Sequence, residues 1–354
     1  MKLYENGEKF MSAFDFMKWL NHKYLVDNPD KIWIKRSSCI SIQKASQNAY
    51  SAFKRFFNGV SRFPKFKKKN KQDVKMYFCR QGRNDSIKCE RHRIKIPTLG
   101  WVKLKEKGYI PTNSNTHIIR QGTVSYKAGR YYVSVLVEEM QPMKGALNDF
   151  GIGIDLGLKE FAVLSDGKVY RNINKTKRIK DLEKRLNRER HKWARKYDSY
   201  LKRKELDENC SKQNLLKQQI KVQKVFHQLD NIRADYINKC INEIVRAKPS
   251  YVTIEDLNVV QMMKNKFLAI DIQKQKFYEF KTKLIAKCKE YGIEVRVVDR
   301  FYPSSRTCHN CGHIKHDLKL SDRVYKCPEC GFKIDRDLNA ALNLRDAQIY
   351  KVIL

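Results

Sequence analysis

Two groups of residues in the sequence have types and spacings that could bind metal ions. The first group comprises two C-x2-C pairs separated by fifteen residues: Cys308, Cys311, Cys327 and Cys330. Four thiolates at this spacing can converge tetrahedrally on Zn²⁺, and a shell filled by four thiolates leaves no open catalytic position. Gly312 and Gly331 each follow a pair, where a tight turn requires a permissive residue. The spacing therefore predicts one structural zinc ion.

The second group comprises three acidic residues in positions that suit chemistry on a phosphate. Asp155 ends the apolar stretch GIGID, Glu255 ends VTIE, and Asp337 begins a predicted helix just after the last cysteine pair. Hydrolysis of a phosphodiester by two metal ions needs carboxylates clustered around one phosphate, and carboxylate oxygens suit Mg²⁺ or Mn²⁺. A sheet of the RNase H type would gather such residues from distant positions. The three acids therefore predict a centre with two catalytic Mg²⁺ or Mn²⁺ ions.

Each carboxylate also has an ordinary structural explanation. Asp155 alone could form a turn, and Asp256 lies beside Glu255, so either of that pair could be a solvated strand end. Asp335 lies two residues before Asp337, and we expect one of them to cap the following helix. The functional interpretation is favoured by the combination of the three acids with the cysteine pairs and the charge of the chain.

The charge of the chain indicates a polyanionic partner. The 354 residues include 74 Lys+Arg and 38 Asp+Glu, which gives a net charge of +36. Nucleic acid is the expected neutralising partner, because a small acidic substrate would not require charge on this scale. No apolar run approaches the roughly 18 residues of a membrane span, and the N-terminus has no signal-peptide core. With no sign of secretion, we expect reduced thiols, no membrane partner and a cytoplasmic, nucleoid-associated protein.

The elements that must position these residues can be predicted from local patterns. Residues 1–75 are predicted to be helical and basic, and 76–148 to be a small β-rich domain with a hairpin that turns near Ala128 and Gly129. The stretch IGIDLGLKEFAVLSDGKVY predicts two short strands joined at Asp166 and Gly167. Strands and helices then alternate, which predicts an α/β domain interrupted after Ser305 by the cysteine region. Helices are expected over 175–206, 213–247 and 270–291, and strands over 251–257 and 293–299.

Basic residues outside the predicted centre could contact phosphates. The segment 61–71 places Phe63 and Phe66 among lysines and arginines, and the helix predicted over 175–206 is strongly basic. Several phosphate contacts would make binding depend strongly on salt, and the two phenylalanines could stack on bases. Trp193 is instead expected to pack within the helical hairpin. The predicted contacts are Arg62, Lys65, Lys67, Lys68, Arg185, Arg188, Arg306 and Arg336.

These motifs closely resemble those of the TnpB (OrfB) family, transposon-encoded nucleases that are similar to the ancestors of type V CRISPR effectors. The motifs occur in the family's order and surround the cysteine region in the family's way. The resemblance is close over 150–345 and looser back through GWVKL and RFPKFK. It is carried by GIDLGLKEFAVLSDG (153–167), TIEDLNV (253–259), VVDRFYPSSRTCHNCG (297–312) and YKCPECGFKIDRDLNAALNL (325–344).

The resemblance implies a RuvC-type, RNase H-like nuclease domain with a helical insertion (175–247) and an inserted zinc ribbon. That domain would cover 149–305 and 333–354, with the ribbon at 306–332 and a wedge domain at 76–148. Asp155, Glu255 and Asp337 match the three catalytic carboxylates, since Asp337 rather than Asp335 places Asn339 in the family's register. The family also implies a guide RNA from the transposon end, cleavage of double-stranded DNA beside a short motif, and no small-molecule substrate.

Three other functions stay open at this point. A nuclease-inactive, RNA-guided repressor should have lost a carboxylate, although an N-terminus shorter than the family's could leave the wedge sheet incomplete and disable cutting. A transposase that acts directly on DNA ends would not need a guide. A zinc-ribbon DNA-binding protein without a guide would explain neither Glu255 nor the strand context of Asp155.

Overall fold

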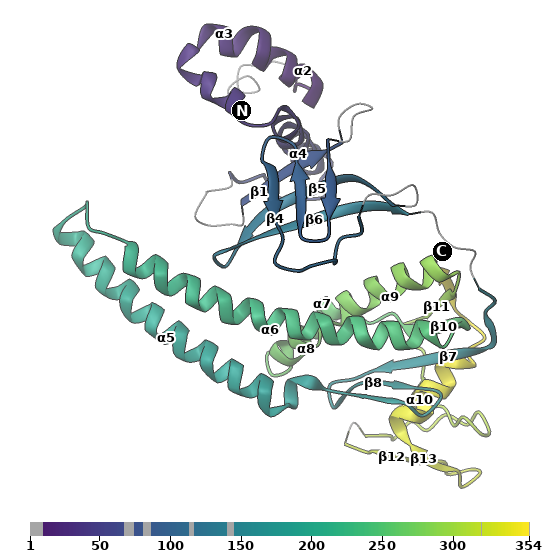
Figure 1. Ribbon diagram of the computed structural model, residues 1–354. Coiled ribbons are helices and arrows are strands. Elements are labelled where there is room, and N and C mark those ends of the chain that lie inside the picture. The colour runs from purple at the N-terminus through teal and green to yellow at the C-terminus, as the bar shows by residue number, and fades with distance from the viewer. Residues whose placement is uncertain are drawn as a thin grey trace. The chain divides into compact units, whose positions relative to one another are not determined.

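The computed structural model describes residues 10–66, 74–80, 86–112, 117–139, 145–319 and 321–353 (Figure 1). Its contacts divide the chain into two units, Met1–Pro142 and Met143–Leu354. Lys67 and Lys68, two of the predicted phosphate contacts, lie outside the described residues. None of the described helices has the length and apolar character that a membrane span requires.

The first unit begins with a group of helices. Ser12 caps the first of them, because its Oγ accepts a hydrogen bond from the Asp15 backbone N–H at 3.1 Å. Phe63 packs edge-on against Phe56 with 5.2 Å between ring centroids, whereas Phe66 is 94% exposed. Of the two predicted stacking residues, Phe66 is therefore the more accessible. The helices are α2 (Ala13–Trp19), η1 (Leu20–Tyr24), α3 (Leu25–Asp27), η2 (Pro29–Arg36) and α4 (Cys39–Phe57).

Two small antiparallel sheets complete the first unit. One has the order β1 (Val74–Cys79), β5 (His117–Lys127), β6 (Arg130–Glu139), and the other comprises β2 (Lys88–Glu90), β3 (Arg93–Ile96) and β4 (Gly100–Lys103). The β5–β6 hairpin turns at Ala128 and Gly129, which have φ values of 49° and 80°. Positive φ at both positions suits a tight hairpin turn, and the predicted turn is confirmed. Phe78, Ile94 and Ile119 form the buried core.

A six-stranded sheet forms the centre of the second unit. Strands β7, β10 and β11 are parallel, and the remaining pairings are antiparallel. The stretch predicted as two strands forms three, because residues 157–159 make a further turn ahead of the one at Asp166 and Gly167. The order is β14 (Lys351–Ile353), β11 (Glu294–Val298), β10 (Pro249–Glu255), β7 (Asn148–Leu156), β8 (Glu160–Leu164) and β9 (Val169–Arg171).

Helices cover both faces of this sheet (Figure 1). On one face, α6 (Gln213–Arg246) and α9 (Phe277–Tyr291) bury the main core with the inward residues of β7, β10 and β11. On the other face lies α10 (Arg336–Arg345). Helix α6 packs back along α5 (Lys177–Leu206), and the chain between them, 207–212, is not helical. The predicted helical hairpin and its break are confirmed. Two short strands, β12 (Val324–Lys326) and β13 (Lys333–Asp335), belong to the cysteine region.

The single helix predicted over 270–291 is two helices. Helix α8 (Ala269–Gln275) ends at Lys276, whose φ of 56° places it in the left-handed region, and α9 begins directly afterwards. The Lys276 Nζ lies 2.7 Å from carboxylate oxygens of both Asp230 and Glu279. The ion pair with Asp230 reaches across to α6, so the break involves a tertiary contact that a local pattern does not contain. A short helix, α7 (Val259–Met262), precedes α8.

Candidate active site

Asp155 and Glu255 lie side by side at the ends of two neighbouring parallel strands. Ile154 of β7 pairs with Ile254 of β10, so the next residues along both strands share one face and one edge of the sheet. Ile154 and Ile254 face the apolar core, and successive side chains alternate. The two carboxylates therefore project to the opposite face, which α10 covers. The carboxyl ends of parallel strands are where functional groups collect in open α/β sheets.

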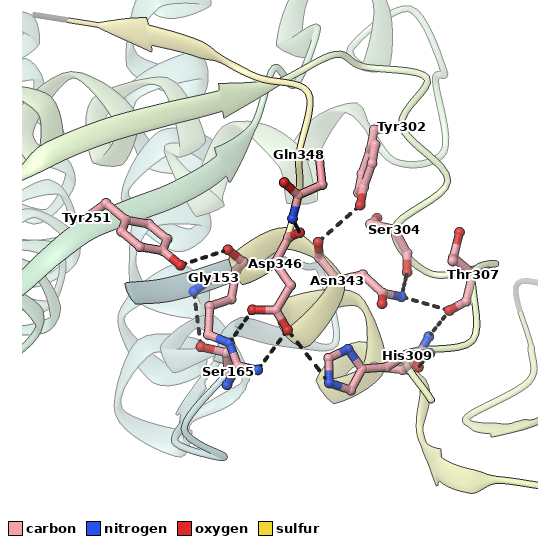
Figure 2. Close-up of polar contacts among 12 residues, drawn as sticks. Gly153, Ser165, Tyr251, Tyr302, Ser304, Thr307, His309, Asn343, Asp346 and Gln348 are labelled. Carbon is pink, nitrogen blue, oxygen red and sulfur yellow. Dashed lines mark hydrogen bonds and ion pairs between the residues drawn. The ribbon is translucent and has the colours of Figure 1, made fainter. Parts of the chain in front are cut away.

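Helix α10 brings the third acid to this edge. Gly153 lies on the same face of β7 as Asp155 and allows α10 to pack directly on the strand. The Gly153 N–H donates a hydrogen bond to the Ser165 Oγ at 3.0 Å (Figure 2). Because Ser165 follows β8, this bond holds β7 against the start of the turn at Asp166 and Gly167. Asp337, in the first turn of α10, is close enough for its charge to act on Asp155.

The two neighbouring aspartates at the start of α10 have different roles. Asp335 caps the helix, since its Oδ1 accepts hydrogen bonds from the backbone N–H groups of Asp337 at 2.9 Å and Leu338 at 3.1 Å. The Asp337 side chain is 21% exposed and lies 3.8 Å from the Arg336 Nε. The capping position expected from the sequence is thus taken by Asp335 and not by Asp337.

Burial and acidic neighbours raise the proton affinity of Asp155. Burial raises the pKa of Asp155 well above 3.8, and the charges of Glu255 and Asp337 raise it further. Burial also raises the pKa of Glu255, while a hydrogen bond from the Ser304 hydroxyl acts in the opposite direction. Concentrated negative charge away from water is costly unless cations neutralise it. This donor set of hard carboxylate oxygens fits divalent cations such as Mg²⁺ or Mn²⁺.

Among the described residues, the four cysteines are the one group with three or more ligand atoms all within 4.8 Å of one another. The three carboxylates do not form so tight a cluster in the metal-free chain.

The cysteine sulfurs are already arranged as a tetrahedral zinc site requires. The Sγ atoms of Cys308 and Cys330 are 3.6 Å apart, as are those of Cys311 and Cys327. Thiolates about 2.3 Å from a tetrahedral Zn²⁺ would be separated by about 3.8 Å. Hydrogen bonds from the Phe332 backbone N–H and the Asn310 side chain lower the pKa of Cys330 to about 6, which favours the thiolate that binds metal.

The predicted phosphate contacts are mostly accessible side chains. Arg62 and Lys65 are exposed in the first unit, and Arg185, Arg188 and Arg306 are exposed in the second. Arg336 is different, because its guanidinium is only 15% exposed and its Nη1 donates to the backbone carbonyls of residues 319 and 322. These hydrogen bonds tie α10 to the cysteine region instead of presenting the cation to solvent.

The sequence interpretation missed a basic groove between α5 and α6. The groove has a volume of about 460 Å³, and its lining includes Lys196, Lys217, Lys221 and Lys224. The last three lie on one side of α6, because residues spaced by three, four and seven share a helix face. That spacing was readable in the sequence, but the contribution of Lys196 depends on how α5 packs. Four ammonium groups around one groove can bind successive phosphates.

A smaller groove opens beside Glu255. It has a volume of about 170 Å³ and an apolar lining that includes Leu156, Val259 and Phe277. Tyr278, on its rim, is 73% exposed. Among the acidic residues, Glu255 and Asp256 line this groove.

Comparison with known proteins agrees with this architecture. A family model described as "Cas12f1-like, TNB domain" matches residues 277–344, and the OrfB model, described as "Probable transposase", matches 134–266. InsQ of Escherichia coli (strain K12), named as a candidate RNA-guided DNA endonuclease, is 27% identical over 96% of this chain and 82% of its own length. A protein of Streptomyces pristinaespiralis with the same description is 29% identical over 88% of this chain and 72% of its own length.

The fold is shared with a solved structure. The cryo-EM structure of the Cas12f1–sgRNA–target DNA complex superposes with a TM-score of 0.56 at 16% identity, covering 88% of this chain and 71% of that chain. Fold and site together therefore define a mixed α/β protein that shares the fold of Cas12f1 and has a four-cysteine cluster. Within this class, the chain is similar to proteins of the TnpB (OrfB) family.

Proposed function

We propose that this chain is an RNA-guided DNA endonuclease of a transposable element, and that it hydrolyses DNA by a two-metal, RuvC-type mechanism. The observation that carries the proposal is that Asp155 and Glu255 stand at the ends of neighbouring parallel strands and that Asp337, in the first turn of α10, lies near enough for its charge to act on Asp155. Strands β7, β8 and β9 are antiparallel, and β10 and β11, which follow in the chain, run parallel to β7 on its other side. This arrangement supports an RNase H-like domain. The names of its relatives support the guide and the substrate.

The chemistry assigned to each residue follows from its place. Two Mg²⁺ or Mn²⁺ ions, when bound, would activate water and stabilise the leaving oxygen. Asp155, which feels the charge of both other acids, would hold these ions together with Glu255 and Asp337. The Ser304 hydroxyl holds the Glu255 carboxylate through a hydrogen bond. The four cysteines would hold one structural Zn²⁺ ion.

The remaining parts of the chain are assigned to the nucleic acids. We propose that a guide RNA from the transposon end binds the basic surfaces, which include Arg62, Lys65, Arg185, Arg188, Arg306 and the groove between α5 and α6. Double-stranded DNA is the proposed target. The finer division into a helical region (1–75), a wedge-like domain (76–148), a nuclease domain (149–305 and 333–354) and a zinc ribbon (306–332) belongs to the same proposal.

Plasmid cleavage tests this function. The protein is co-expressed with RNA from its flanking transposon end and assayed with Mg²⁺ at low salt, with and without a matching target. We expect cleavage that requires the matching target and is lost in Asp155→Ala. Target-dependent binding without cleavage would favour the repressor, and cleavage of transposon ends without a guide would favour a transposase.

A further inference from the structure

We propose that two buried asparagines of α10 couple the zinc ribbon to the carboxylate centre, and that Ser304 and Asn343 are positioning residues for metal binding by Glu255. The proposal rests on the function proposed above and adds a physical link between its two metal sites. The link consists of hydrogen bonds along residues 302–309, the segment that leads from β11 into the first cysteine pair (Figure 2).

The first step of the link is the contact between Ser304 and Glu255. The Ser304 Oγ–H donates to the Glu255 Oε1, and Ser304 is only 5% exposed. A carboxylate that ligates a metal ion depends on such outer partners for its orientation, because each carboxylate can otherwise rotate and bind through either oxygen. Contacts that hold Ser304 in place therefore also determine which oxygen of Glu255 remains available to a metal ion.

The second step is the support of Ser304 by α10. The Asn343 Nδ2 donates to the backbone carbonyls of both Ser304 and Thr307 at 2.7 Å. The Asn343 backbone carbonyl accepts a hydrogen bond from the Tyr302 hydroxyl at 3.1 Å. Asn343 is 6% exposed, so its amide N–H groups bond to these carbonyls instead of water. Asn343 thus holds the turn that presents the Ser304 hydroxyl.

The third step ties the same turn to the zinc ligands. The Asn339 Nδ2 donates to the Thr307 carbonyl at 2.7 Å, and its Oδ1 accepts the His309 backbone N–H at 3.1 Å. Asn339 is fully buried, and its side chain brackets Cys308, the first ligand of the ribbon. Asn339 and Asn343 are four residues apart and lie on one helix face. One face of α10 therefore fixes both Cys308 and Ser304.

Two consequences follow for the assembled protein. A change at Ser304 or Asn343 should loosen the Glu255 carboxylate without removing any proposed metal ligand. Disturbing Asn343 should also weaken the attachment of the ribbon, whereas removing only the Ser304 hydroxyl should not. The two residues can therefore be separated by measuring the two metals independently.

The test is a titration of the full-length protein with Mn²⁺, followed by electron paramagnetic resonance, with zinc measured by elemental analysis. We expect Ser304→Ala to weaken Mn²⁺ binding about 10- to 100-fold, the usual effect of losing an outer partner of a metal ligand, with full zinc content. Ser304→Thr, which keeps a hydroxyl, should recover most of the affinity. Asn343→Ala should weaken Mn²⁺ binding similarly and also release zinc faster to a chelator.

Matched controls lie at the starts of β10 and β7, the strands that carry Glu255 and Asp155 near their other ends. Ser250→Ala removes a hydrogen bond to the Phe150 carbonyl at the start of β10, and Asn148→Ala removes one to the Ala247 carbonyl at the start of β7. Both should keep wild-type Mn²⁺ affinity. A folded Ser304→Ala variant with wild-type affinity would overturn the coupling while leaving the carboxylate centre intact. If the Asp155→Ala variant binds Mn²⁺ as tightly as wild type does, both the proposed centre and the coupling are wrong.

Discussion

The backbone of Gly153 passes so close to α10 that a Cβ atom on this residue would lie 2.0 Å from the Ala341 carbonyl oxygen. The same Cβ would lie 2.5 Å from the Arg345 backbone nitrogen. Both obstructing atoms belong to the backbone of a helix, so no side chain can move aside. The close approach therefore requires glycine and sets the depth at which α10 packs on β7, two residues from Asp155.

Gly153→Ala should consequently damage both stability and the carboxylate centre. Forcing a methyl group into this space must push α10 outward, and overpacking of this kind costs about 3 kcal/mol. Urea unfolding should show this loss, and Mn²⁺ affinity should fall because α10 carries Asp337. Gly145→Ala is the control, since its Cβ would meet only the end of the flexible Lys248 side chain at 3.0 Å. Equal stability of the two variants would contradict this account of Gly153.

The elements that could be predicted from sequence are those with a local cause. The periodicities of α5 and α6 and the turn at Ala128–Gly129 are local patterns, and the structure has these elements. The break at Lys276 was missed because it depends on the ion pair with Asp230, 46 positions earlier in the chain. The extra turn at residues 157–159 was missed because the apolar runs on either side of it read as one strand.

Asp155→Asn should stabilise the protein in the absence of added divalent ions while abolishing cleavage. Asp155 is partly buried beside Glu255 and Asp337, so removing its charge relieves repulsion that no bound metal ion offsets. Cleavage should fall at least about a hundred- to a thousandfold, the scale for losing a group that acts directly on developing charge. Thermal unfolding with and without Mg²⁺ measures the first effect, and Mg²⁺ should stabilise wild type only. Asp149→Asn, at the exposed start of β7, should behave as wild type.

The same charge gives the metal-free protein an unusual pH dependence. The pKa of folded Asp155 lies above 3.8, so the folded chain takes up this proton at a higher pH than the unfolded chain does. Its contribution to the free energy of unfolding therefore increases as the pH falls through the raised pKa toward 3.8. Asp256 acts oppositely, because Lys281 lowers its pKa and its stabilisation is lost as the pH falls below 3.8. Urea unfolding of wild type and Asp155→Asn should show a stability difference that narrows on acidification; a constant difference would contradict the assignment.

Those parts of the site that lie within contiguous sequence motifs could be predicted from the sequence. The four cysteines and the strand-end positions of Asp155 and Glu255 can be read directly from the sequence. The choice between Asp335 and Asp337 could not be made from spacing alone, because either carboxylate could turn back to cap α10. The hydrogen bond of Ser304 with Glu255 joins residues 49 positions apart and carries no local signal.

Loss of zinc should disturb the ribbon first and the carboxylate centre second. Cys330→Ser removes a thiolate from the cluster, and we expect the purified protein to lose its zinc and unfold in two thermal steps. Because Asn339 brackets Cys308, loosening the ribbon should also lower Mn²⁺ affinity at the carboxylates. Cys39→Ser changes an exposed cysteine outside the cluster and serves as the control. Undiminished Mn²⁺ affinity after zinc loss would show that the two centres are independent.

The lysines of the groove between α5 and α6 should contribute to nucleic-acid affinity without affecting sequence choice. Replacing Lys217, Lys221 and Lys224 by glutamine should weaken binding of matched and unmatched duplexes by similar factors, because ammonium groups bind phosphates and not bases. For B-DNA, the slope of log affinity against log salt should become shallower by about 0.9 for each phosphate that the protein no longer neutralises. Fluorescence anisotropy over a series of salt concentrations measures both quantities.

The matched control for the groove removes the same charge elsewhere. Lys239, Lys283 and Lys287 are paired with Asp235, Glu279 and Glu290 at 2.7, 2.7 and 2.9 Å, so their charges are already partly neutralised. Changing these three to glutamine lowers the net charge by the same amount as the groove substitutions. If binding responds only to the overall charge, the two triple variants will lose affinity equally. If the groove holds phosphates, only the groove variant will show the shallower salt slope, and its cleavage rate at saturating nucleic acid will stay near that of wild type because the carboxylates are untouched.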